Sequence, residues 1–145
     1  MLTITRDLFS ETFRVLRDCG KMVNECQVLW LSAHAAPDSI LTVRHSTHDS
    51  TGGGVEVDSV WLNTLWRELR SSSLSIRAQI HTHPGMAFHS KTDDAFPIVG
   101  SPGFISIVVP NFATHGPTLR GLYATSITPS GKWQELPITE VLQVL

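Results

Sequence analysis

The chain has 145 residues, of which 41% are hydrophobic and 17% are charged, a composition typical of one globular domain spanning residues 1–145. Eleven Lys and Arg against thirteen Asp and Glu give a formal net charge of -2, and the chain contains no basic block that would attract nucleic acid or an anionic membrane. A signal-peptide pattern and an apolar run of roughly 18 residues are both absent. We therefore expect a cytoplasmic protein without a nucleic-acid or membrane partner.

The first third of the sequence predicts a helix followed by a β-hairpin. Apolar residues recur with helical spacing over residues 7–19, and Gly20 follows as a helix stop. Residues 26–33 and 39–46 are short β-type runs, separated by the turn sequence HAAPD. The apolar positions of the predicted helix are Phe9, Phe13 and Leu16.

A polar, glycine-rich segment, HSTHDSTGGG, follows at residues 45–54 and predicts a loop that could act as a flap over a substrate. A second metal site formed by His45, His48 and Asp49 is a less favoured interpretation of the same segment. Asp58 is then placed to cap a helix over residues 59–71. The residues on the apolar face of that helix are Leu62, Leu65, Trp66 and Leu69.

Residues 73–84 alternate between apolar and polar side chains, as expected of a strand with one buried face. A short helix near Ser90 and three further strands, at 104–110, 119–128 and 132–138, complete the predicted elements. This order predicts an α+β fold in which a mostly antiparallel, curved sheet is flanked by helices. On the strand, Leu74, Ile76, Ala78 and Ile80 are predicted on one face and Arg77, Gln79, His81 and His83 on the other.

The stretch QIHTHPGMAFHSKTDDAF contains a pattern typical of a metal site. His81 and His83 lie two residues apart on a predicted strand, so both imidazoles can reach one ion. Pro84 ends the strand because it has no N–H to donate to a neighbour. Ser90 and Asp93 fit one helical turn, from which the carboxylate can point back towards the histidines. Two imidazoles, one carboxylate and an open fourth position are typical of a catalytic zinc site.

HTHP followed by Ser-x-x-Asp at a helix start resembles the signature of the JAMM/MPN+ (JAB/Mov34-type) zinc metalloproteases, and the predicted order of elements extends this resemblance over most of the chain. The resemblance implies a cytidine-deaminase-like three-layer fold. It also implies that His81, His83 and Asp93 hold Zn²⁺, that Ser90 stabilises the oxyanion, and that Glu25 is the general base.

Two alternatives stay open within this site. The turn between Pro84 and Ser90 has five residues, one fewer than the usual family spacing, which makes Asp94 a rival to Asp93 as the third ligand. The glycines that usually follow the family's glutamate are absent after Glu25, so Glu56 is a competing candidate for the base.

The resemblance implies an isopeptidase or peptidase that cleaves after the C-terminal tail of a ubiquitin-like protein. Its partners would be that protein or its conjugates, and the matching activating and conjugating enzymes, as in a bacterial conjugation or antiphage defence system. A peptidase that matures a sulfur-carrier or ubiquitin-like precursor would use the same residues. A catalytically silent MPN scaffold and a zinc hydrolase of small amides or nucleotides are less favoured functions for the same fold.

The remaining cysteines and histidines carry weaker signals. Cys19 and Cys26 are too few for a disulfide framework, so we expect two reduced, buried thiols. His89 precedes Ser90 and is expected to lie beside the metal ligands or at the surface. His115, in THGP, is expected in a turn.

Overall fold

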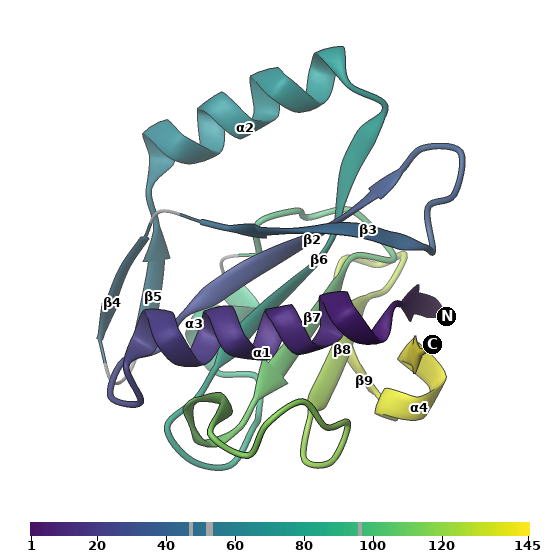
Figure 1. Ribbon diagram of the computed structural model, residues 1–145. Coiled ribbons are helices and arrows are strands. Elements are labelled where there is room, and N and C mark those ends of the chain that lie inside the picture. The colour runs from purple at the N-terminus through teal and green to yellow at the C-terminus, as the bar shows by residue number, and fades with distance from the viewer. Residues whose placement is uncertain (47, 52–53, 96) are drawn as a thin grey trace.

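A six-stranded sheet forms the centre of the molecule in the computed structural model, which describes residues 1–46, 48–51, 54–95 and 97–145 (Figure 1). Its strands, in spatial order, are β3 (Ile40–His45), β2 (Gln27–Ala33), β6 (Leu74–Thr82), β7 (Ile105–Val109), β8 (Tyr123–Ile127) and β9 (Trp133–Leu136). Only the β6–β7 pair is parallel among these neighbours. The predicted α+β fold with a mostly antiparallel sheet is confirmed.

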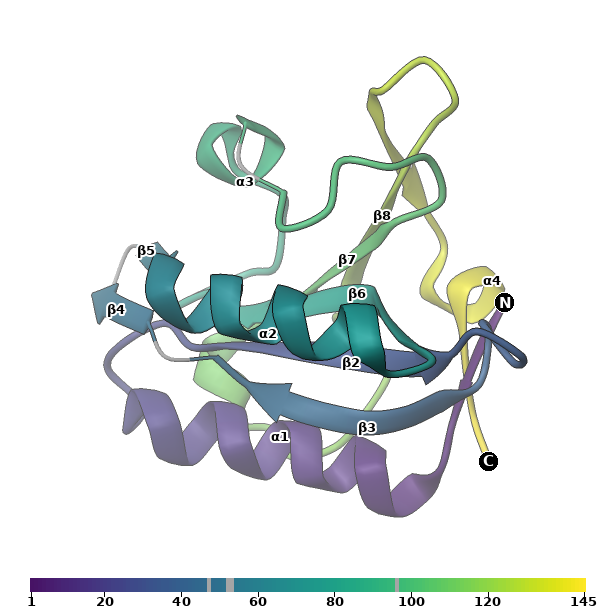
Figure 2. The same ribbon diagram turned by 90° about the horizontal axis from the view of Figure 1, so that it is seen from above.

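Helix α1 (Arg6–Gly20) covers one face of the sheet, and Figure 2 shows it below the strands. The Thr5 hydroxyl accepts a hydrogen bond from the Leu8 N–H and so caps the helix. Gly20 was the predicted stop, yet it lies inside the helix, and Lys21 adopts the left-handed conformation at the C-cap with φ 51°. The apolar face of α1 packs against inward-facing residues of β2, β6 and β7 in the larger hydrophobic cluster.

Helix α2 (Ser59–Ser71) packs with a second hydrophobic cluster on the opposite face of the sheet. Asp58 accepts a hydrogen bond from the Trp61 N–H at 2.8 Å, which confirms the predicted cap. Leu29 and Leu31 of β2 face this cluster, whereas the intervening Trp30 faces α1. The sheet therefore lies between helical layers, and both of its faces are covered by apolar contacts.

Strand β6 contains a bulge that the sequence did not predict. The register between β2 and β6 skips Arg77, and a bulge of this kind reverses the faces of the residues before it. As a result Ala78 and Ile80 join the cluster under α1, whereas Leu74 and Ile76 join the cluster under α2. The predicted alternation is therefore correct only after the bulge.

Short elements at the edges of the fold were also not predicted. β1 (Leu2–Ile4) pairs in parallel with β10 (Leu142–Val144), which places the two chain ends side by side. β4 (His48–Thr51) pairs with β5 (Gly54–Val57), so residues 48–51 and 54 form strands instead of the predicted loop. Residues 47, 52 and 53 of that predicted loop lie outside the described residues. The side chains of His48 and Asp49, which belong to the less favoured second metal site, lie outside the described residues. The 3-10 turn η1 (Asn111–Ala113) and α4 (Ile138–Val141) were likewise not predicted, whereas α3 (Lys91–Ala95) confirms the predicted short helix near Ser90.

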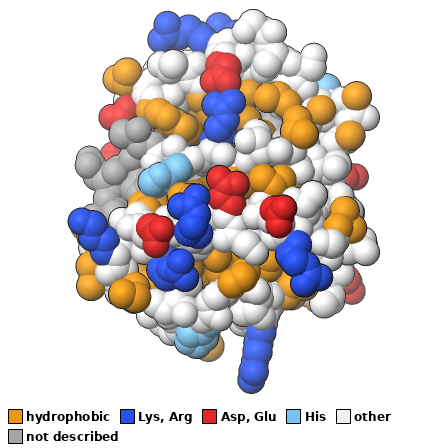
Figure 3. Space-filling model, in the orientation of Figure 1, with side chains coloured by type: hydrophobic (Ala, Val, Ile, Leu, Met, Phe, Trp, Pro, Cys, Tyr) orange, Lys and Arg blue, Asp and Glu red, His pale blue; other side chains and the backbone are white. Residues whose placement is uncertain are grey.

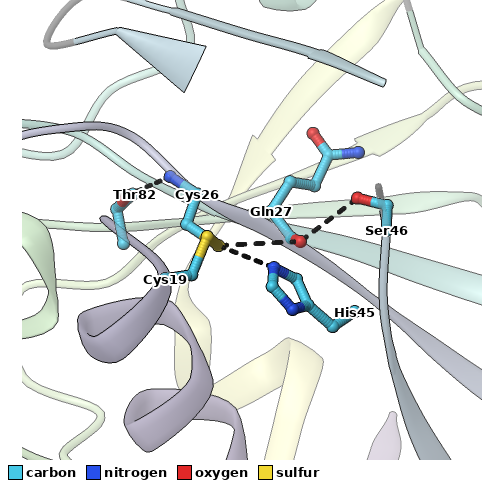
Figure 4. The surroundings of a disulfide bond; sticks show 6 residues. All are labelled: Cys19, Cys26, Gln27, His45, Ser46 and Thr82. Atoms are coloured by element: carbon cyan, nitrogen blue, oxygen red, sulfur yellow. Dashed lines mark hydrogen bonds between the residues drawn. A yellow bond between two sulfur atoms is a disulfide. The ribbon is translucent and has the colours of Figure 1, made fainter. Parts of the chain in front are cut away.

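The prediction of reduced cysteines is wrong in this structure, because Cys19 and Cys26 form a disulfide (Figure 4). Cys19 lies in the last turn of α1 and Cys26 lies directly before β2. The short connection between helix and strand brings their Cα atoms to 6.1 Å, within the range that a disulfide spans. Counting cysteines could not reveal this proximity, since it depends on how the helix end meets the strand.

The outer face of α1 carries charges of both signs, which Figure 3 shows interspersed on the side facing the viewer. Arg14 and Arg17 each lie within 4.0 Å of the exposed Asp18 carboxylate.

No helix in the described part of the chain is both long and apolar enough to cross a membrane.

Candidate metal centre

A pocket of about 360 Å³ lies at the end of β6 that carries the two predicted histidine ligands. Its lining includes all five residues predicted for the site, together with Gln27, which the sequence did not single out: Glu25, Gln27, His81, His83, Ser90 and Asp93. These residues lie at the start of β2 or just before it, at the end of β6 or just after it, and at the start of α3 or just before it. The fold therefore brings together segments more than fifty residues apart in sequence.

The Asp93 carboxylate lies between the two histidines. Its Oδ2 is 3.2 Å from His81 Nε2 and 3.4 Å from His83 Nε2, and one ligand atom from each of the three residues lies within 4.8 Å of the others. Ligands held tetrahedrally at about 2.0–2.1 Å from a zinc ion would be about 3.3 Å apart. The two distances from Asp93 Oδ2 therefore match the edges of one zinc coordination shell.

The state of His81 provides an independent test of whether a metal fits. The residue is buried, and neither of its ring nitrogens has a well-directed hydrogen-bond partner among the described residues. Burial lowers the pKa of the imidazole, which favours the neutral form that binds metals. A buried nitrogen without a partner is costly, and a metal ion between His81 and Asp93 would satisfy Nε2, the nitrogen that faces the Asp93 carboxylate.

The Asp93 side chain is held in place by the start of α3. The Ser90 N–H donates to Asp93 Oδ2 at 2.9 Å, and the Asp93 N–H donates to Ser90 Oγ at 3.1 Å, which is a reciprocal capping arrangement. Burial alone raises the pKa of the Asp93 carboxyl, but the two imidazoles and the Ser90 N–H outweigh this effect and hold the pKa well below its usual range. The carboxyl is therefore ionised, as a metal ligand must be.

The rival aspartate, Asp94, points elsewhere. Its Oδ1 lies 2.5 Å from His89 Nδ1, and half of its side chain is exposed. His89 Nε2 contacts the Ser106 hydroxyl at 3.2 Å, and the His89 ring packs edge-on against Trp133. His89 and Asp94 thus fasten α3 to the sheet next to the candidate site, while the Asp93 carboxylate faces the histidines.

The backbone of His83 is fixed on both sides. Its N–H donates to the Val109 carbonyl at 2.9 Å, and its carbonyl accepts from the Phe112 N–H at 2.9 Å. The second bond requires the η1 turn, in which Asn111, Phe112 and Ala113 all have positive φ between 52° and 61°. Non-glycine residues rarely adopt this conformation, and such strain is concentrated at functional sites.

Glu25 lies in the same pocket and is 6% exposed. Burial raises the pKa of Glu25 from 4.5 to about 7. His83 opposes this increase in pKa, and the Asp93 carboxylate adds to it. A carboxyl with a pKa near neutrality can both take and return a proton at physiological pH. The competing Glu56 is exposed on β5, and it does not line this pocket.

Comparisons with known proteins place the chain among metalloproteases and MPN-type folds. No protein-family model matches the sequence. A curated protein of Sinorhizobium fredii, "Probable metalloprotease y4jG", is 30% identical over 141 residues, which cover 94% of this chain and 87% of that protein.

Three solved structures share the fold at low sequence identity. Protein DSY2949 from Desulfitobacterium hafniense has a TM-score of 0.73 at 16% identity, covering 100% of this chain and 93% of its own. A Salinibacter ruber protein has a TM-score of 0.60 at 17% identity, with coverages of 94% and 88%. AF2198, a JAB1/MPN domain protein from Archaeoglobus fulgidus, has a TM-score of 0.53 at 13% identity, with coverages of 99% and 97%. With this fold and a metalloprotease relative that spans nearly all of it, the chain belongs to the MPN/JAMM-type family of metallopeptidase-like proteins.

Proposed function

We propose that this protein is a zinc-dependent isopeptidase or peptidase that cleaves after the C-terminal tail of a ubiquitin-like protein. The observation that carries the proposal is the meeting of His81, His83 and Asp93 with the buried carboxyl of Glu25 in one pocket. Three metal ligands beside a base with a pKa near 7 are the groups that hydrolysis without a covalent intermediate requires.

In this proposal the residues of the pocket have separate roles. A zinc ion bound to His81, His83 and Asp93 supplies a Lewis acid that polarises the scissile carbonyl and acidifies water. Glu25 takes a proton from the attacking water and passes it to the leaving amine. The Ser90 hydroxyl oxygen accepts a bond from the Asp93 N–H, so its own hydrogen is left to donate to the developing oxyanion.

The surroundings of the pocket support an extended substrate. A larger hollow of about 820 Å³ shares Met86 with the metal pocket and includes Asn111, His115 and Arg120 in its lining. Within this lining, His115 lies in a turn, as the sequence predicts. Met86 and Phe88 are largely exposed apolar residues beside the pocket, and Phe88 packs edge-on against the His83 ring. Two adjoining hollows suit a peptide tail that runs past the metal ligands, with small residues where the backbone must approach closely.

The test is a panel of ubiquitin-like proteins, each linked through its C-terminus either as a linear fusion or as an isopeptide conjugate. The zinc-loaded protein is expected to cut just after the tail, and Glu25→Gln is expected to leave the panel uncut. Cleavage of linear fusions alone would identify a precursor-maturing peptidase. If neither linkage is cut, the proposal fails, and turnover of a small amide by the same sample would identify a general zinc hydrolase instead.

A further inference from the structure

A second group of side chains of the types that bind metals lies where the end of α1, the start of β2 and the end of β3 meet. Cys19 is in the last turn of α1, Cys26 directly precedes β2, and His45 is the last residue of β3. One ligand atom from each lies within 4.8 Å of the others, and Cys26 Sγ is 3.4 Å from His45 Nε2 (Figure 4). The nearby Gln27 carbonyl accepts a hydrogen bond from the Ser46 hydroxyl.

This group is separate from the pocket that holds Glu25. Neighbouring side chains on an extended segment point to opposite faces, and Cys26 accordingly lies in the hydrophobic cluster under α1, whereas Glu25 and Gln27 line the pocket. The backbone of Cys26 is fixed by two bonds with Thr82: the Cys26 N–H donates to Thr82 Oγ1, and the Thr82 N–H donates to the Cys26 carbonyl. The position of its sulfur is therefore set by the sheet and not by the disulfide alone.

The ligand chemistry fits a borderline-soft ion. Zinc binds thiolate sulfur at about 2.3 Å and imidazole nitrogen at about 2.0–2.1 Å, so sulfur and nitrogen on one tetrahedral ion are about 3.6 Å apart. The 3.4 Å between Cys26 Sγ and His45 Nε2 is close to that edge. Cys26 is buried while His45 is exposed, so a fourth position on the solvent side is open to water.

We propose that in the reduced protein Cys19, Cys26 and His45 bind one zinc-class ion, and that the disulfide is the oxidised, metal-free form of this site. Reduction breaks the S–S bond with two electrons and two protons, which a dithiol reductant supplies as it becomes a disulfide. The two thiols release their protons when the ion binds, and the neutral imidazole donates its Nε2 lone pair. The ion would then link α1 to both β2 and β3, whereas the disulfide links α1 to β2 alone.

Cobalt substitution tests this site separately from the site of the proposed function. Thiolate sulfur bound to Co²⁺ absorbs strongly in the near ultraviolet, whereas a site of two imidazoles and a carboxylate contains no sulfur and lacks that absorption. The full chain, reduced with a phosphine and then freed of it, is titrated with Co²⁺ beside an unreduced sample. We expect the near-ultraviolet band and one additional equivalent of bound Co²⁺ in the reduced sample alone.

Variants identify the ligands. His45→Ala should weaken Co²⁺ binding at the thiolate site at least about 10-fold, and Cys19→Ser with Cys26→Ser should abolish the band. The double variant His81→Ala, His83→Ala is the matched control and should keep the band while losing the other equivalent. Absence of the band in reduced wild-type protein would overturn the proposal. An unchanged affinity in His45→Ala, which replaces an exposed side chain, would equally overturn it.

Discussion

Glu25 and Glu56 are chemically identical side chains in different surroundings, so they provide a matched pair of variants. Glu25→Gln preserves the shape of a buried side chain and removes its ability to accept a proton. We expect the variant to keep its metal and to lose hydrolysis by about 100-fold or more. Glu56→Gln, at an exposed position, should change the rate little. Rates on a cleavable fusion, with metal content measured on the same samples, decide between the two; an inactive Glu56 variant beside an active Glu25 variant would assign the base to Glu56.

The raised pKa of Glu25 also predicts a pH-dependent stability of the metal-free protein. The folded state holds the carboxyl proton until a pH of about 7, against 4.5 for an ordinary glutamate, because burial disfavours the charge. The stability that this proton contributes is complete below about pH 4.5 and is lost as the pH rises through 7. Glu25→Gln cannot ionise, so its free energy of unfolding should rise relative to wild type between pH 5 and pH 8. Urea unfolding of chelator-treated samples measures this; a constant difference would contradict the raised pKa.

Asp93 and Asp94 are adjacent, yet only the first faces the histidines. Asp93→Ala removes one of three proposed ligands and should lower zinc affinity by at least about 100-fold. Asp94→Ala removes a carboxylate bound to His89 and should lower it far less. Competition with a chromophoric chelator measures both affinities. The reverse order would show that Asp94 is the ligand and that the start of α3 in solution differs from the one described above.

The metal ligands could be predicted from the sequence, whereas the other residues around the site could not. The histidines and the aspartate are close in sequence, and strand and helix periodicities alone predict that they converge. Glu25, in contrast, is more than fifty residues from His81, so its place in the pocket depends on the pairing of β2 with β6. The lining role of Gln27 depends on the same pairing, whereas the Cys19–Cys26 disulfide depends on how the end of α1 meets the start of β2. No local pattern indicates either.

At the scale of elements, the long helices were predicted well because they carry strong local signals. α2 has a capping aspartate and an apolar face with helical spacing, and both are found in the structure. β1 and β10 are three residues each, too short for a periodic pattern to stand out, and they exist because they pair with each other across the whole chain. The bulge at Arg77 is likewise a tertiary feature: the Arg77 guanidinium donates to the Gly103 carbonyl and to the Asp38 carboxylate, contacts from two distant loops.

The cap of α2 supports a prediction at this scale. Asp58→Ala leaves the Trp61 N–H without its acceptor, which should lower the free energy of unfolding by about 1 kcal/mol. Zinc affinity should stay unchanged, since α2 contributes no residue to the metal pocket. Asp58→Asn serves as the control, because the amide oxygen can accept the same bond. Chemical denaturation gives the stability difference; an Asn variant as unstable as the Ala variant would show that the cap is not the cause.

At the scale of the whole molecule, the proposed zinc ligands join two separate parts of the fold. His81 lies near the end of β6, a strand in the middle of the sheet, and His83 directly follows that strand. Asp93 lies on α3, which Figure 2 shows on the side of the sheet opposite α1. The unfolded chain does not hold these three groups in one coordination shell. Binding of an ion to the folded state should therefore stabilise the entire molecule.

Zinc at a free concentration 100 times its dissociation constant should raise the free energy of unfolding by about 2.7 kcal/mol. The measurement is chemical denaturation of the oxidised protein with and without zinc, so that the Cys19–Cys26 disulfide stays closed and only the pocket site can respond. In the His81→Ala, His83→Ala double variant the increase should disappear. Asp94→Ala is the matched control, since it alters the same helix without removing a proposed ligand, and it should keep most of the increase. An equal gain in wild type and in the histidine double variant would place the stabilising ion outside the pocket, and the metal-centre assignment would then be wrong.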